Sequence, residues 1–233
     1  MTLIFDHSSQ GTTGLKFRKP TEGPEYEMVR NFIEHSLPKP NRNQDLIVLV
    51  EPRFNAGAPD VVAVYWNRSK LGDFSHRRSV LSKKDIKIMQ YIMQSSGADL
   101  EDIVSTFSHD CKKSIDKLIS EKMIYHKGRK LFAYSKMKKG VIDRILTIEA
   151  KIHDWRGGII QASNYFWLGE EVYLLIRENN NKDKIIDQAR ILGVGVIFNG
   201  EQMKHVGTHD LVPTYGYWMM NEMILFSNGK VNA

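Results

Sequence analysis

Five short runs with the patterns expected of β-strands, separated by segments with helical spacing, constrain the fold of this chain more than any other feature. The first two runs are separated by Asn55, Gly57 and Pro59, which indicates a turn between strands. Strands that alternate with helices favour an α/β domain with a partly parallel sheet. The expected strands are 45–51, 60–66, 144–151, 171–177 and 194–198, and the expected helices around them are 24–37, 156–168 and 181–192.

Positive charge is concentrated in the middle of the chain. Residues 68–140 contain 17 Lys and Arg against 8 Asp and Glu, a formal charge of +9, whereas the remainder has 16 against 19, a charge of −3. A basic module between slightly acidic flanks is the electrostatic pattern of nucleic-acid binding, although a solvated basic face has the same composition. The charge therefore favours a nucleic acid as the partner of this segment and leaves the solvated face as the alternative.

The composition disfavours several classes of protein. Apolar runs of about ten residues are too short to cross a bilayer core of roughly 30 Å, so no membrane segment is expected. The N-terminus lacks a basic stretch followed by a long apolar segment, which argues against secretion and favours a cytoplasmic location. Cys111 is the single cysteine, so neither an internal disulfide nor a cysteine-rich zinc site can form.

Residues 82–138 have the element order of a compact DNA-binding module. A helix is expected over 83–95 with Ser82 as its N-cap, followed by a short helix, a turn and a longer helix over 109–122. Two short strands then flank the sequence HKGRK. The segment resembles the winged helix-turn-helix family. The resemblance implies that the longer helix enters the major groove and that the strand turn contacts phosphates, through Lys112, Lys113, Lys117, Lys127, Arg129 and Lys130.

A second pattern is divided between the two flanks of this module. Pro59-Asp60 begins one expected strand, Glu149-Ala150-Lys151 ends another, and Gln161 and Tyr165 follow on a helix. In this order the residues resemble the PD-(D/E)xK nuclease superfamily, over 25–66 and 141–198. The resemblance implies an α/β, mixed-sheet, restriction-endonuclease-like core with an inserted winged helix-turn-helix domain. The expected domains are 1–66 plus 141–233 and 82–138, with 67–81 as a linker.

The residue types suit hydrolysis of a phosphodiester bond. This reaction needs a hard cation that neutralises the phosphate and acidifies a water, and two carboxylates with a backbone carbonyl suffice for Mg²⁺. Asp60 and Glu149, on adjacent strands, could supply that pair, with Mg²⁺ or Mn²⁺ as the cofactor. Lys151 shares a strand face with Glu149 because side chains alternate, and its ammonium can orient the attacking water or stabilise the developing charge.

Three further residues are candidates for the same site. Gln161 and Tyr165 are four positions apart on a helix and therefore share a face, and the superfamily places such residues beside the site. The superfamily also often takes an acid from the first helix. Glu25, Glu27 and Glu34 are the acids available there. Glu25 is closest to the buried face of the helix and is the first candidate, with Glu27 as the alternative.

These patterns predict a metal-dependent DNA endonuclease, in which the winged helix delivers duplex DNA to Asp60, Glu149 and Lys151. The alternative is a non-cleaving DNA-binding transcriptional regulator whose nuclease-like domain dimerises or senses a ligand, since a fold does not determine an activity. A module that binds protein instead is disfavoured by its basic charge. Because each site would cut one strand, two cuts in a duplex would suggest a homodimer.

Overall fold

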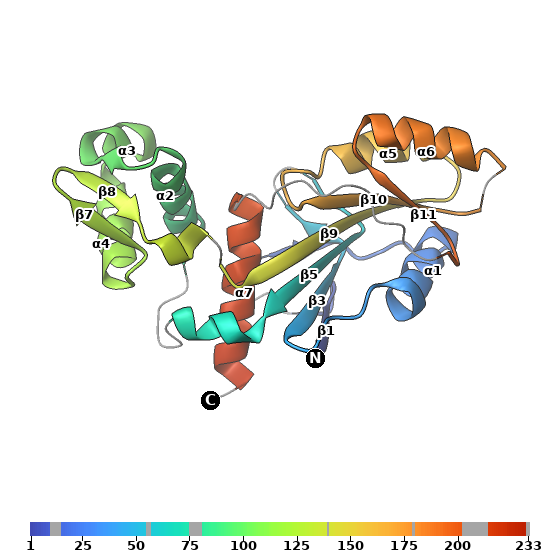
Figure 1. Ribbon diagram of the computed structural model, residues 1–233, viewed down its shortest axis with the longest axis horizontal. Coiled ribbons are helices and arrows are strands. Elements are labelled where there is room, and N and C mark those ends of the chain that lie inside the picture. The colour runs from blue at the N-terminus through green and yellow to red at the C-terminus, as the bar shows by residue number, and fades with distance from the viewer. Residues whose placement is uncertain are drawn as a thin grey trace. The chain divides into compact units, whose positions relative to one another are not determined.

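The computed structural model describes residues 1–9, 15–54, 57–74, 81–138, 140–178, 180–201 and 214–231, and Figure 1 shows their helices and strands. The chain divides into two compact units. The first comprises Met1–Arg68 and Asp143–Val212, and the second comprises Ser69–Ile142 and Pro213–Ala233. The expected mixed α/β class is confirmed, and among the described residues no helix is long and apolar enough to cross a membrane.

The first unit is built on a six-stranded sheet of order β1-β3-β5-β9-β10-β11. β3 (Gln44–Val50) pairs parallel with β1 (Thr2–Phe5) and antiparallel with β5 (Val61–Asn67). β10 pairs parallel with both its neighbours, so the expected partly parallel sheet is present. β1 has no counterpart among the expected strands, because four residues are too few to show a period. The remaining strands are β9 (Ile142–Lys151), β10 (Glu171–Ile176) and β11 (Gly195–Phe198).

Helices cover both faces of this sheet. α1 (Pro24–Asn31) packs on one face, and α5 (Trp155–Ser163) and α6 (Lys182–Ile191) pack on the other. The helical segment that begins with α1 matches the expected 24–37 to within one residue, whereas α5 is shorter than expected. α1 continues as a π-helical turn over Phe32–Ser36 before the chain becomes extended ahead of Pro38, and α5 ends at Ser163 and not at 168.

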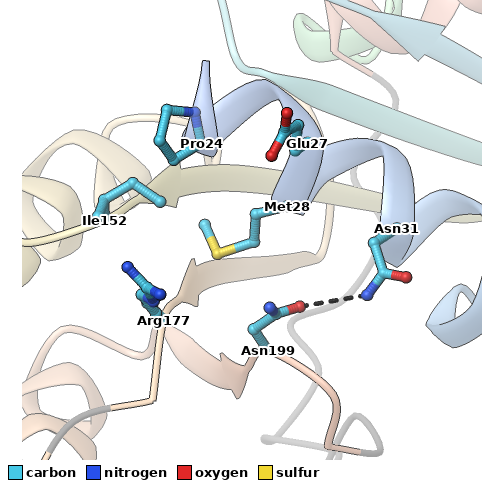
Figure 2. A pocket seen from close by; sticks show the side chains of 7 residues that line it. All are labelled: Pro24, Glu27, Met28, Asn31, Ile152, Arg177 and Asn199. Atoms are coloured by element: carbon cyan, nitrogen blue, oxygen red, sulfur yellow. Dashed lines mark hydrogen bonds between the residues drawn. The ribbon is translucent and has the colours of Figure 1, made fainter.

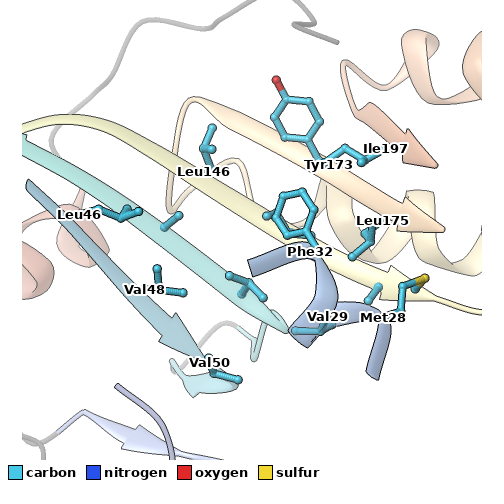
Figure 3. Packing of buried hydrophobic residues seen from close by; sticks show 14 of the residues in the cluster. Met28, Val29, Phe32, Leu46, Val48, Val50, Leu146, Tyr173, Leu175 and Ile197 are labelled. Carbon is cyan, nitrogen blue, oxygen red and sulfur yellow. The ribbon is translucent and has the colours of Figure 1, made fainter. Parts of the chain in front are cut away.

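β10 shows how the sheet is buried on both sides. Tyr173 and Leu175 join the cluster beneath α1, together with Phe32, as Figure 3 shows. Val172 and Leu174 join the opposite cluster beneath α5 and α6. Successive side chains of a strand point to opposite faces. The sequence of a strand that is covered on both faces is therefore continuously apolar and does not alternate between apolar and polar residues.

Residues 83–133 of the second unit form three α-helices and a small antiparallel sheet, with the helices and the last two strands in the order that the sequence predicts. The helix expected over 109–122 is α-helical only over Lys112–Ser120. Ser82 caps the first helix as expected, and its side chain and that of Asp85 form a reciprocal capping box. The helices are α2 (Lys83–Gln94), α3 (Leu100–Phe107) and α4 (Lys112–Ser120), and the sheet of order β6-β8-β7 contains β6 (Ala98–Asp99), β7 (Ile124–Lys127) and β8 (Lys130–Ala133).

The C-terminal helix α7 (Tyr215–Val231) belongs to this second unit, whereas the sequence grouped residues 213–233 with the α/β domain. Buried polar side chains of α7 explain the difference. Glu222 accepts a hydrogen bond from the backbone N–H of Leu81 at 3.1 Å, and Asn221 accepts one from Val141 at 2.9 Å. Consecutive residues of α7 therefore bind the segments that enter and leave the 82–138 module, so its two ends lie close together, as an insertion requires.

Candidate active site

Asp60 and the Glu149-Ala150-Lys151 segment meet in the first unit because β5 and β9 are neighbours in the sheet. The side chain of Asp60, just before β5, accepts a hydrogen bond from the Ala150 N–H at 2.7 Å, across 90 positions of the chain. On β9 the Lys151 ammonium donates to Glu149 Oε1. The three side chains expected from the sequence are thus gathered at one edge of the sheet.

Helix α1 contributes Glu25 to this group. Its carboxylate Oε1 lies 3.8 Å from Lys151 Nζ, and it lines a cavity of about 210 Å³ together with Asp60. Glu27, the alternative acid on the same helix, lines a different pocket. Glu25 and Glu27 are two positions apart on α1, so their side chains point in different directions and line different pockets.

Arg18 and Glu51 also belong to the site, although the sequence patterns do not indicate them. Arg18 follows β2 (Lys16–Phe17), which pairs with β4 (Pro52–Arg53). This pairing brings the Arg18 guanidinium to Glu51, with Nε 2.7 Å from Oε2, and to Asp60, with Nη2 3.4 Å from Oδ1. A ladder of two residues has no detectable period, so only the folded chain shows the contact.

Gln161 and Tyr165 are on or next to the helix α5, beside Glu149. Gln161 is exposed and donates from Nε2 to the Tyr165 hydroxyl at 3.2 Å. Tyr165 is buried, and its pKa is raised by burial and by the negative charge of Glu149. The sequence-predicted pair therefore forms a hydrogen-bonded unit whose hydroxyl is close to the carboxylate.

The carboxyl groups of Asp60, Glu51 and Glu149 are held close together and largely away from water, whereas that of Glu25 is about half exposed. Burial and the charge of Asp60 raise the pKa of Glu149 to about 7, against the lowering effect of Lys151. Burial also raises the pKa values of Asp60, Glu25 and Glu51. Burial alone would lower the pKa of Lys151, but its hydrogen bond and ion pair with Glu149 raise it. The ammonium therefore stays charged.

The donor set suits a divalent cation. When ionised, the four carboxyl groups exceed the two cations, Arg18 and Lys151, by two negative charges. Glu149 is 1% exposed, and its Oε2 accepts no hydrogen bond from any residue that the structure describes. The same residues contain no group of three or more His, Cys, Asp or Glu side chains arranged to enclose a metal. Mg²⁺ needs only one or two carboxylates, because it retains several waters.

In the second unit, most of the expected DNA contacts are exposed. Lys112 and Lys113 are exposed on α4, and Lys127, Arg129 and Lys130 are exposed at the β7–β8 turn. Lys117 differs, because its ammonium pairs with the buried carboxylate of Asp85 at 2.8 Å. That side chain holds α4 against α2, so it is occupied inside the module.

Known proteins add no further constraint to these observations. The chain has no match among protein-family models, curated proteins or solved structures.

Proposed function

We propose that this chain is a metal-dependent DNA endonuclease with Asp60, Glu149 and Lys151 at its phosphodiester-cleaving site. The observation that carries the proposal is the meeting of these side chains from opposite flanks of the 82–138 module, with Glu149 Oε2 buried and unpartnered among the described residues. A buried polar atom without a partner is costly, and a bound cation removes that cost.

Asp60 and Glu149 would hold the cation. When bound, Mg²⁺ or Mn²⁺ supplies charge neutralisation at the phosphate and an acidified water. Lys151 holds a positive charge beside the reacting phosphate, and Glu149 and Glu25 orient its ammonium. Arg18 fixes the carboxylate of Asp60 and offsets part of the local negative charge. Tyr165 and Gln161 limit the directions that the Glu149 side chain can take.

The second unit would bind the substrate as a winged helix-turn-helix domain. Its element order, its formal charge of +9 over residues 68–140 and the exposure of Lys112 and Lys113 support this assignment. In that family the third helix, here α4, enters the major groove, and the turn between β7 and β8 contacts the backbone. Phosphate contacts of this kind position the duplex without reading its sequence.

A cleavage assay tests the proposal. Wild-type protein is incubated with supercoiled and linear DNA in Mg²⁺, in Mn²⁺ and in EDTA, beside the variants Asp60→Asn, Glu149→Gln and Lys151→Ala. We expect cleavage that requires the metal and falls by about 10²-fold or more in each variant. Glu178→Gln, which alters an exposed carboxylate, is the matched control and should cleave as wild type does.

Equal activity in all variants would sink the assignment of the site. A gel-shift assay with the same proteins separates binding from catalysis. DNA binding by the wild type without any metal-dependent cleavage would favour the alternative, a regulator that binds DNA with a nuclease-like fold.

A further inference from the structure

A second pocket, of about 420 Å³, is lined by α1 and by residues at the ends of the strands. Figure 2 shows the side chains that line it. One wall is α1 itself, with Glu27, Met28 and Asn31. The other wall consists of residues that directly follow three parallel strands, namely Ile152 after β9, Arg177 after β10 and Asn199 after β11. Its volume is within the range of about 300–1,000 Å³ that is common for small-molecule sites.

The position of this pocket is favourable for a ligand. The carboxyl ends of parallel strands meet at one edge of a sheet, and open α/β sheets bind ligands in the crevice there. The pocket is also next to the carboxylate site. Lys151 immediately precedes Ile152, and α1 presents Glu25 to the carboxylate site and Glu27 to this pocket.

The polar groups that line the pocket include a cation, an anion and two neutral amides. Arg177 is exposed and has no ion-pair partner among the residues that the structure describes, and Glu27 is exposed on the opposite wall. Asn31 donates from Nδ2 to Asn199 Oδ1 at 3.4 Å, which leaves one amide acceptor and one amide donor. The carboxylate of Glu27 would repel a simple anion. The polar side chains of the pocket therefore fit a ligand that has both hydrogen-bond donors and hydrogen-bond acceptors.

Met28 and Ile152 add an apolar surface to this polar rim. A planar ligand with apolar faces and a polar edge is complementary to such a lining. Nucleobases have this form, and Arg, Asn and Glu are side chains that pair with their edges. The chemistry of the pocket is therefore that of a nucleotide site.

We propose that this pocket binds one nucleotide with an unpaired base, its face against Met28 and Ile152 and its polar edge toward Asn31, Asn199 and Glu27. Arg177 contacts the phosphate of that nucleotide. The identification of the ligand as part of the DNA strand being cut rests on the proposed nuclease function. In that case the enzyme prefers DNA in which a base near the cut is mismatched or single-stranded, because an unpaired base is already free of its stack.

The first experiment needs no catalysis. The four deoxynucleoside 5′-monophosphates are titrated separately into the wild type and into Arg177→Ala, Asn199→Ala and Arg190→Ala, and binding is followed by saturation-transfer NMR. We expect saturable binding of at least one nucleotide, weakened at least fivefold by Arg177→Ala and by Asn199→Ala. Arg190→Ala, which alters an exposed arginine on α6, is the control and should bind as wild type does.

Absence of binding for all four nucleotides, or equal binding in every variant, would overturn the proposal whether or not the protein cleaves DNA. The second experiment compares cleavage of a matched duplex, the same duplex with single mismatches and the single strand. We expect wild type to cut mismatched or single-stranded DNA at least fivefold faster and Arg177→Ala to lose that preference. Nucleotide binding without this preference would overturn the assignment to the cleaved strand and leave a free-nucleotide site.

Discussion

The backbone N–H of Ala150 donates a hydrogen bond of 2.7 Å to the side chain of Asp60. Asp60 is thereby held beside the strand that carries Glu149 and Lys151. The hydrogen bond lowers the pKa of Asp60, although burial raises it on balance. One bond therefore connects the two halves of the candidate site on either side of the 82–138 module, and it positions one acid relative to the other.

Metal binding should stabilise the folded protein through Glu149. We expect Mg²⁺ or Mn²⁺ at a hundredfold excess over its Kd to stabilise wild type by about 2.7 kcal/mol, which differential scanning calorimetry detects as a higher Tm. Glu149→Gln should lose most of this shift, because it removes the charge of the buried Oε2. Glu178→Gln should respond as wild type does. A full shift in Glu149→Gln would show that the metal binds elsewhere.

Gly158 permits α5 to approach the stem of Lys151. A Cβ at this position would lie 2.8 Å from Lys151 Cγ and 2.6 Å from Leu174 Cδ1. We expect Gly158→Ala to displace Lys151 and reduce cleavage by about 10²-fold, since small displacements of a catalytic group are costly. Gly72→Ala, where a Cβ meets nothing within 4 Å, is the control. Unchanged turnover in Gly158→Ala would mean that α5 does not position the ammonium.

The lysines of α4 should separate into two groups. Replacing both Lys112 and Lys113 by Ala should weaken DNA binding and flatten its salt dependence by about 0.9 units of log slope for each phosphate that is no longer neutralised, without changing Tm. Lys117→Ala should instead lower the free energy of unfolding by about 1–3 kcal/mol, because the buried carboxylate of Asp85 loses its ion pair. Fluorescence anisotropy at several salt concentrations and urea unfolding measure the two effects. An unchanged slope in the double variant would contradict docking through α4.

Glu170 should make stability depend on pH. Burial and the neighbouring charge of Glu171 raise its pKa to about 7 in the folded protein, from 4.5. A raised folded-state pKa contributes stability that is complete below pH 4.5 and is lost as the pH rises through 7. At pH 8 the free energy of unfolding of Glu170→Gln should therefore be higher than that of wild type by roughly 1–2 kcal/mol, after solvent screening is allowed for. Near pH 4.5 the two free energies should be equal. Urea unfolding at both pH values measures this, and an equal difference at each would refute the assignment.

Much of the secondary structure could be predicted because its signals are local. The runs that became β3, β5, β10 and β11 are largely apolar, since both faces of the sheet are covered, whereas the run that became β9 alternates between apolar and polar residues. Ser82 and Asp85 form the capping box of α2, a motif that needs only two residues three positions apart. The alternation of side chains along β9 also placed Glu149 and Lys151 on one face before any fold was known.

The sequence by itself therefore determined the elements, the basic charge of the middle module and the acid-and-lysine pattern on its flanks. Only the tertiary structure decided which side chains meet. It brings Arg18 and Glu51 to Asp60, selects Glu25 over Glu27, commits Lys117 to Asp85 and joins α7 to the second unit. The physical reason is range: periodicity and capping act over a few residues, whereas these contacts depend on strand pairing and buried polar groups far apart in the chain.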